Sequence, residues 1–466
     1  MIQERIVDLP PNYLKRTGLF YAGLLAASAA IFIVVLKFGA GLTAATAIAP
    51  ATVAAPRPVS VLPQVLIALA AVVAVGQVLS WLLAKIGQPA VIGEMAAGIL
   101  LGPSLLGHAL SARILAPAGA PTLGVISQFA VILYMYLVGL ELNSRMLRSR
   151  LHANVAISHS SILLPFVLGS ALALVLYPRL GDASVPFISF AMFLGLAMSV
   201  TAFPVLAYIL RERGMSGTQL GATALGCAAA DDVTAWCLLA VVTGVTQAQY
   251  GGTLTTALGA LAYVAVMFFV ARPLLKRLPR GNATTLSRPM QGLMFILLLL
   301  SALATEAIGI HAVFGAFVLG ALTPHDSNVA RLLPKQTEGV VVVLLLPAFF
   351  AFTGMRTEIG LLAGGAGWLL CGLIILVATV GKFGGSLLAA RATGLSWREG
   401  SMLGILMNTR GLMELVVLNI GLDLGIISPT LFSMMVVMAL VTTFATTPIL
   451  DLLIRGDTTG AMKRPA

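Results

Sequence analysis

Two adjacent aspartates lie in the middle of an apolar stretch, where charged side chains are rare. Asp231 and Asp232 occupy the centre of residues 218–244, and each charge at such a position costs about 2.5–3.5 kcal/mol on membrane insertion scales. Neighbours on an α-helix point about 100° apart, so one acid can face another helix while the other faces a water-filled cavity. Buried carboxylates of this kind mark ion or proton pathways, and the pair therefore predicts a functional site rather than packing.

A lysine in another apolar stretch could serve as the partner of one aspartate. Lys382 lies within 361–391, and an ion pair would offset the desolvation of both groups. The alternative is a long side chain that extends to the membrane surface. Because a desolvated lysine can lose its proton, unlike an arginine, Lys382 is also a candidate proton carrier. Small residues that would let another helix approach closely surround it, namely Gly381, Gly384, Gly385 and Ser386.

Two apolar segments, 184–211 and 399–422, are interrupted in mid-span. Irregular backbone at membrane depth is tolerated where it is buried in protein or lines a cavity, and broken helices in corresponding positions of two halves mark transporter sites. A proline kink closed by packing is the alternative for 184–211. The residues concerned are Thr201 and Pro204 in the first segment and Asn408, Arg410, Gly411 and Glu414 in the second, where Arg410 and Glu414 have the i, i+4 spacing of a helical pair.

The composition shows what must position these groups. The chain of 466 residues is 59% hydrophobic and 10% charged, against about 45–50% and 25% in soluble domains, so it is an all-α polytopic membrane protein. Fourteen apolar segments can form transmembrane helices. They are 17–38, 61–84, 87–107, 122–142, 152–177, 184–211, 218–244, 253–276, 287–309, 311–323, 336–353, 361–391, 399–422 and 427–454. The first exceeds the apolar region of a signal peptide, so we expect it to be retained, with 39–60 as a linker.

The basic residues separate the apolar segments instead of clustering on one face, which argues against a nucleic-acid partner. If the fourteen helices alternate across the bilayer, 21 of the 28 lysines and arginines lie on the side of the two chain ends and 5 on the other. This asymmetry predicts that both termini are cytoplasmic. Three cysteines in apolar stretches and five scattered histidines predict neither a disulfide framework nor a metal-ligand cluster, and no cofactor is expected.

The interrupted segments occupy matching positions in two halves. The first half covers 61–211 with 218–244, and the second covers 287–454. Each half ends in an interrupted segment followed by one long helix, which is the arrangement of an inverted repeat.

Six motifs in the same order resemble the second monovalent cation:proton antiporter family, most closely its cation/proton exchanger branch of plants, fungi and bacteria. They are QPAVIGEMAAGILLGPSLLG at 88–107, LVGLE at 137–141, SVTAFPVLA at 199–207, DDVTAW at 231–236, HAVFGAF at 311–317 and NTRGLMEL at 408–415. The resemblance covers 61–454, so helix 17–38 is an addition to the thirteen-helix core of the family.

This resemblance implies an organisation into parts. A dimerisation domain would comprise 61–142 and 287–353, and a mobile ion-carrying domain 152–244 and 361–454. Residues 253–276 would link the two, with 1–60 and 455–466 as the terminal segments. The implied setting is a lipid bilayer, and the implied assembly is a homodimer in a bacterial inner membrane.

The resemblance also assigns roles at the site. Asp232 is the implied ligand of the monovalent cation and Asp231 the implied partner of Lys382, while Thr201 lines the ion site. Pro204, Asn408 and Gly411 belong to the broken segments, and Arg410 and Glu414 have an implied structural role. Since a buried carboxylate is neutralised either by a proton or by a cation, exchange of Na⁺ or K⁺ for H⁺ by alternating access is expected.

Other functions are open at this point. Two acids and a lysine favour electrogenic exchange, whereas many relatives carry Asn or Gln at the first acid, so an electroneutral K⁺/H⁺ exchanger is an alternative. A cation-coupled solute symporter could share the fold but would show polar groups for an organic substrate. An enzyme is not expected, because an intramembrane aspartyl protease needs acids from two helices. A channel would conduct without counter-transport.

Overall fold

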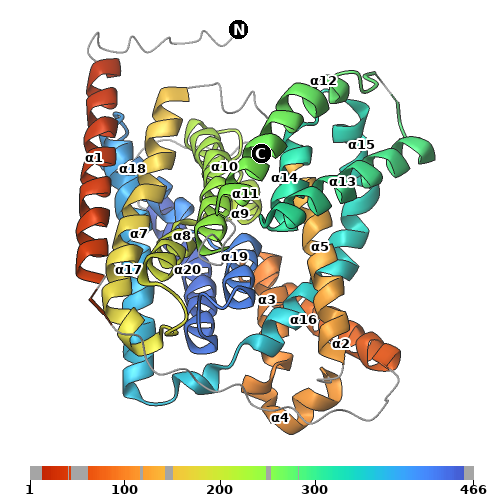
Figure 1. The fold of residues 1–466 in the computed structure, drawn as a ribbon, viewed down its shortest axis with the longest axis horizontal. Coiled ribbons are helices and arrows are strands. Elements are labelled where there is room, and N and C mark those ends of the chain that lie inside the picture. The colour runs from red at the N-terminus through yellow and green to blue at the C-terminus, as the bar shows by residue number, and fades with distance from the viewer. Residues whose placement is uncertain are drawn as a thin grey trace.

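The computed structural model describes residues 13–39, 41–42, 61–115, 119–141, 151–247, 253–281 and 283–455. The predicted N-terminal tail, most of the linker and the C-terminal tail lie outside these residues. The described segments form an all-helical integral membrane protein (Figure 1).

The helices of the first half begin with an N-terminal helix that precedes the expected core. They are α1 (Tyr13–Gly39), α2 (Val61–Lys85), α3 (Ala90–Leu101), α4 (Pro103–Ile114), α5 (Ala120–Glu141), α7 (Leu151–Leu180), α8 (Phe187–Ser199), α9 (Phe203–Glu212) and α10 (Gln219–Gln247). A connecting helix follows in three pieces, α11 (Thr253–Val266), the π-turn η3 (Met267–Ala271) and α12 (Arg272–Leu275).

The helices of the second half include a second π-turn, η4, and a short 3₁₀ turn, η5. They are α13 (Arg288–Ile308), α14 (Ala312–Leu322), α15 (Asn328–Val340), η4 (Val341–Leu345), α16 (Leu346–Arg356), η5 (Ile359–Leu362), α17 (Gly365–Ala392), α18 (Trp397–Met407), α19 (Leu412–Asp423) and α20 (Pro429–Arg455).

Each of the fourteen apolar segments corresponds to helical structure in the described residues. Eleven helices are long and apolar enough to span a bilayer, the pair α18 and α19 forms a span bent by 47°, and α3 and α14 are shorter apolar helices.

The prediction of one helix over 87–107 is wrong, because the chain breaks between α3 and α4 at Gly102. The residue before a proline is pushed towards extended backbone, and Pro103 then suits the first turn of a new helix. Gly102 also lies against α16, since a Cβ atom there would be 2.4 Å from the carbonyl oxygen of Gly354. The segment predicted over 336–353 begins earlier, at Asn328, where the Ser327 hydroxyl caps the helix by accepting a hydrogen bond from Ala330 N at 3.2 Å.

The helices gather into two bundles. Helices α7, α8, α10, α17, α18 and α20 pack against one another in the first bundle, and α2, α3, α5, α14 and α16 in the second (Figure 1). Helix α19 packs on α8 and α20, and α11 contacts both α10 and α13. The N-terminal helix α1 packs along α7 on the outside of the first bundle, where the rings of Phe32 and Phe166 lie 5.6 Å apart.

Candidate ion-binding site

The two interrupted segments meet at their breaks. Helix α8 ends at Ser199, and extended backbone at Val200 and Ala202 leads into α9. The amide of Ala202 donates a hydrogen bond of 3.0 Å to the carbonyl of Thr409, which lies between α18 and α19. Gly411 permits this close approach, because a Cβ atom there would be 2.8 Å from Val205 Cγ2.

Pro204 lies beyond the break, in the first turn of α9. A proline at this position loses no helical hydrogen bond, and its fixed φ suits the start of a helix. The interruption of 184–211 is therefore a true gap between two helices, and the alternative of a proline kink closed by packing is wrong.

Two buried, positively charged side chains contact the C-terminal end of α8. The last carbonyls of a helix lack intrahelical donors and carry the negative end of its dipole. Arg410 donates to the carbonyls of Ala197 and Met198 at 2.8 and 2.6 Å, and Lys382 donates to that of Ser199 at 2.6 Å. The break is therefore held by charge-assisted hydrogen bonds from the other half of the chain.

Arg410 also forms the pair predicted from its spacing to Glu414. Its Nη1 atom lies 2.8 Å from Glu414 Oε2, and both side chains are completely buried. Glu414 lies in the first turn of α19, where the positive end of the helix dipole favours a carboxylate.

Lys382 reaches the break because α17 packs closely on α7. A Cβ atom at Gly381 would be 2.8 Å from Pro165 Cα, and one at Gly385 would be 2.5 Å from the carbonyl oxygen of Ser160. The close approach expected at the glycines around Lys382 is thus present at these two. Gly384 has 3.9 Å to its nearest neighbour and does not require a glycine.

The ammonium group of Lys382 has three close acceptors. Besides Ser199 O, it donates to Ser161 O at 3.1 Å and to Asp231 Oδ2 at 2.9 Å. The side chain is completely buried, so the alternative in which it extends to the membrane surface is wrong. The ion pair implied with Asp231 is present in this geometry.

Asp231 accepts hydrogen bonds from four side chains. Ser158 Oγ lies 2.6 Å from its Oδ1 atom, while Ser161 Oγ and Thr201 Oγ1 each lie 2.7 Å from Oδ2, beside Lys382. Sequence reasoning missed the two serines, since hydroxyl residues are common in apolar helices. Their i, i+3 spacing on one face of 152–177 was the available signal.

The surroundings of Asp232 differ from those of Asp231 in their hydrogen-bond donors. It is completely buried, and neither of its carboxylate oxygens has a hydrogen-bond partner among the described residues. The side-chain oxygen of Asn408, at the end of α18, is also buried without a partner in this part of the chain. A buried charge without a partner is costly, so these oxygens suit a group that takes up a proton or a dehydrated cation.

A cavity of about 260 Å³ lies between the two bundles and reaches the first break. Ala202 and Pro204 line one wall from the first bundle. The opposite wall carries three carboxyl groups, those of Glu94, Glu141 and Glu338. Glu94 of α3 therefore faces a cavity.

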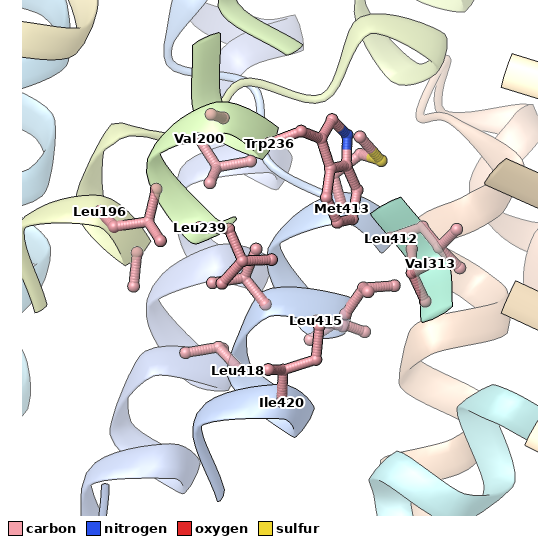
Figure 2. Close-up of a cluster of buried hydrophobic side chains, with 14 of the residues drawn as sticks. Leu196, Val200, Trp236, Leu239, Val313, Leu412, Met413, Leu415, Leu418 and Ile420 are labelled. Carbon is pink, nitrogen blue, oxygen red and sulfur yellow. The ribbon is translucent and has the colours of Figure 1, made fainter. Parts of the chain in front are cut away.

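Apolar side chains fill the space between the bundles beyond the aspartates. Trp236, one turn along α10 from Asp232, gathers with Met413, Leu412 and Val313 in Figure 2. The Trp236 ring lies 5.9 Å from that of Phe317 on α14. Val313 of this apolar cluster also lines a second cavity of about 30 Å³, together with Asn419 and Asp423.

A family model described as "Sodium/hydrogen exchanger, transmembrane" matches residues 67–453. The chain belongs to this family. The resemblance to cation:proton antiporters inferred from the six motifs is confirmed. Members of this exchanger family are transporters, and the broken helices and the acid pair lie within the matched residues.

Relatives of this exchanger are named as antiporters. The Na⁺/H⁺ antiporter NhaS4 of Synechocystis is 43% identical over 81% of the chain and 94% of the relative. Cation/H⁺ antiporter 20 of Arabidopsis thaliana is 36% identical over 83% of the chain and 48% of the relative. K⁺/H⁺ antiporter 1 of Saccharomyces cerevisiae is 33% identical over 78% of the chain and 43% of the relative.

A solved structure shares the fold of this exchanger. It is the sodium proton antiporter MjNhaP1 from Methanocaldococcus jannaschii at pH 8, with a TM-score of 0.59 over 85% of this chain and 98% of that one. The sequence identity is 13%, so this likeness speaks for the fold alone.

Proposed function

We propose that the protein exchanges a monovalent cation, Na⁺ or K⁺, for protons by alternating access, with Asp232 as the shared site. The observation that carries this proposal is the contrast between two neighbouring acids. Asp231 has four hydrogen-bond donors, whereas the equally buried Asp232 has none among the described residues. A single carboxylate that either ligand can neutralise makes the binding of one depend on the loss of the other.

The remaining site residues have supporting roles. Lys382 and Arg410 hold the end of α8, and Thr201 connects the break to Asp231. Asn408 offers its unpartnered oxygen as a further cation ligand. Two acids and a lysine give the site more than one position for a proton, which favours electrogenic exchange driven by about 2.3 kcal/mol per charge per 100 mV.

The packing supports a division of labour between the bundles. In this proposal 152–244 and 361–454 form the ion-carrying domain, which moves against a dimerisation domain made of 61–142 and 287–353, with 253–276 as the link. The protein acts as a homodimer in the lipid bilayer of a bacterial inner membrane. Both termini face the cytoplasm, which puts the cavity with its three carboxyl groups on the cytoplasmic side.

The direct test is cation-driven proton movement in proteoliposomes. A pH-sensitive dye inside the vesicles reports proton flux when Li⁺, Na⁺, K⁺ or Rb⁺ is added, with and without a clamped membrane potential. We expect Asp232→Asn to abolish the flux, because a neutral amide can neither bind and release a proton nor balance the charge of a cation. Retained exchange in this variant would refute the assigned role.

A matched control is Asp182→Asn, which changes an exposed acid bound to Ser184 in a loop. It should exchange as the wild type does. A symporter would need an organic solute before protons move, whereas this proposal requires a response to the cation alone. A channel would carry current without counter-transport.

A further inference from the structure

The different surroundings of Asp231 and Asp232 originate largely in α7. Two of the four donors to Asp231 are hydroxyl groups of this helix, those of Ser158 and Ser161. Both serines are completely buried. They lie three residues apart, on one face of the helix.

We propose that Ser158 and Ser161 are positioning residues that commit Asp231 to Lys382 and leave Asp232 as the carboxylate available to the transported cation. The inference rests on the proposed exchange function and specifies how one acid of the pair is selected. Neither serine needs to touch the cation, since both act through Asp231.

The hydrogen bonds divide unevenly between the two oxygens of Asp231. Oδ2 lies close to Ser161, Thr201 and Lys382, whereas Ser158 is the donor recorded for Oδ1. A carboxylate offers about four acceptor positions, so the donors around Asp231 match its ionised form. Loss of the Ser158 hydroxyl would leave Oδ1 of Asp231 buried without this donor. The less neutralised negative charge of Asp231 would then act on Asp232, one residue away.

The nearby hydrogen-bond donors cannot easily replace that hydroxyl. Lys382 already donates to two carbonyls besides Asp231, and Thr201 is shared with the carbonyl of Met407 at 3.3 Å. The charged and titratable groups that act electrostatically within this cluster include Lys382 from α17, Asp232 and Cys227 on α10 itself, Tyr134 from α5, and the pair Arg410 and Glu414 from the second break.

The test is the pH dependence of the apparent KM for Na⁺ or K⁺ in proteoliposomes. In Ser158→Ala, less of the negative charge of Asp231 is neutralised, so Asp232 should hold its proton more tightly. Protons should therefore compete with the cation for Asp232 up to higher pH. We expect KM near neutral pH to rise roughly three- to tenfold, the equivalent of a shift of about half to one pH unit. At alkaline pH KM should return to the wild-type value, with the maximal rate little changed throughout.

Ser160→Ala is the matched control. Ser160 is a buried neighbour whose hydroxyl donates to Ala156 O of its own helix at 2.7 Å, without contact to the acid pair. It should leave the KM profile unchanged. Ser161→Ala provides a second variant if Ser158→Ala folds poorly, and it should shift KM in the same direction.

A double variant separates positioning from general damage. In an Asp231→Asn background, Ser158→Ala should add little, because the charge through which the hydroxyl acts is gone. An unchanged KM profile in both serine variants, an equal effect of Ser160→Ala, or a full effect in the Asp231→Asn background would overturn the inference. If the wild type exchanges normally in these vesicles, the proposed function survives that result, whereas a wild type without exchange would refute both.

Discussion

At the scale of single residues, two adjacent acids on one helix have different surroundings. Asp231 lies against Lys382 and three hydroxyl groups, and Asp232 has no polar partner among the described residues. The helical rotation of about 100° per residue separates the two directions. In the proposed mechanism, Asp231 therefore stabilises the break and Asp232 binds the transported ion.

Asp231→Asn tests the contribution of the first acid to the transported charge. Lys382 would lose the carboxylate that stabilises its charge, while Asp232 could still bind either a proton or a cation. We expect exchange to continue but with a smaller dependence on membrane potential, measured as flux under clamped voltages. An unchanged current would contradict electrogenic exchange through this pair.

Lys382→Met tests the same pair through stability. The change keeps much of the side-chain length but leaves the charge of Asp231 buried without its cation, which costs about 3–5 kcal/mol for a buried pair. We expect a clear fall in melting temperature in detergent. Arg213→Met is the control, because Arg213 pairs with Asp451 at 2.8 Å near the surface, where such pairs contribute about 0–1 kcal/mol. Equal melting temperatures for the two variants would contradict this reading.

The sequence identified the charged members of the site because a charge in an apolar segment is conspicuous. Lys382, Arg410 and Glu414 could be found in this way, and the spacing of the last two predicted their pair. Ser158 and Ser161 could not, since a hydroxyl residue in a helix usually bonds to its own backbone, as Ser160 does. Ser161 Oγ also lies 2.8 Å from the carbonyl oxygen of Ser158 in its own helix, so only the packing of α7 against α10 distinguishes the two serines.

At the scale of helices, the site depends on how closely α17 and α7 approach. Gly385 faces the backbone of α7, whereas the adjacent Gly384 does not. The run of small residues predicted a close contact, but the choice among neighbouring glycines depends on the rotation of α17 about its axis. In the same way, Pro204 indicated that the helix is interrupted. The place of the break, between 199 and 203, depends on packing against the other half, where Ala202 donates a hydrogen bond to Thr409.

Gly385→Ala should push α17 away from α7. The new Cβ atom would lie 2.5 Å from Ser160 O, and overpacking of this kind costs about 1–3 kcal/mol. We expect a lower melting temperature and slower exchange, because Lys382 moves with α17. Gly384→Ala, whose Cβ atom has 3.9 Å of space, should be neutral or slightly stabilising in the helix. Equal melting temperatures and equal exchange rates in the two alanine variants would contradict this account.

At the scale of the whole molecule, the two sides of the acid pair differ in how the bundles meet. One side holds the 260 Å³ cavity with Glu94, Glu141 and Glu338. The other side is filled by apolar side chains around Trp236 and then by polar contacts between α16 and α19. The cavity reaches Ala202 at the first break, whereas Asp232 is completely buried and does not line it. In the proposed mechanism this asymmetry corresponds to one end state of alternating access, with the cavity on the side from which the site opens.

The polar contacts on the closed side join the bundles through Arg356 of α16. Its guanidinium donates to Asn419 Oδ1 at 3.1 Å and to Asp423 Oδ1 at 2.5 Å, and Asn419 donates in turn to Thr353 at 2.9 Å. If the first bundle moves to expose Asp232 on this side, these contacts must break. Arg356→Gln should therefore favour the opposite end state, by about fivefold for a contribution near 1 kcal/mol.

Thiol labelling measures this shift. In a background without Cys227, Cys237 and Cys371, a cysteine in place of Val416, which lines the 30 Å³ cavity, reports access from the closed side. Arg356→Gln should speed its reaction with a membrane-impermeant reagent. Arg280→Gln should not, because the exposed pair of Arg280 with Asp326 lies away from the contact between α16 and α19. Equal labelling rates in the two variants would mean that Arg356 does not hold the bundles together on this side, and that the apolar cluster around Trp236 closes it alone.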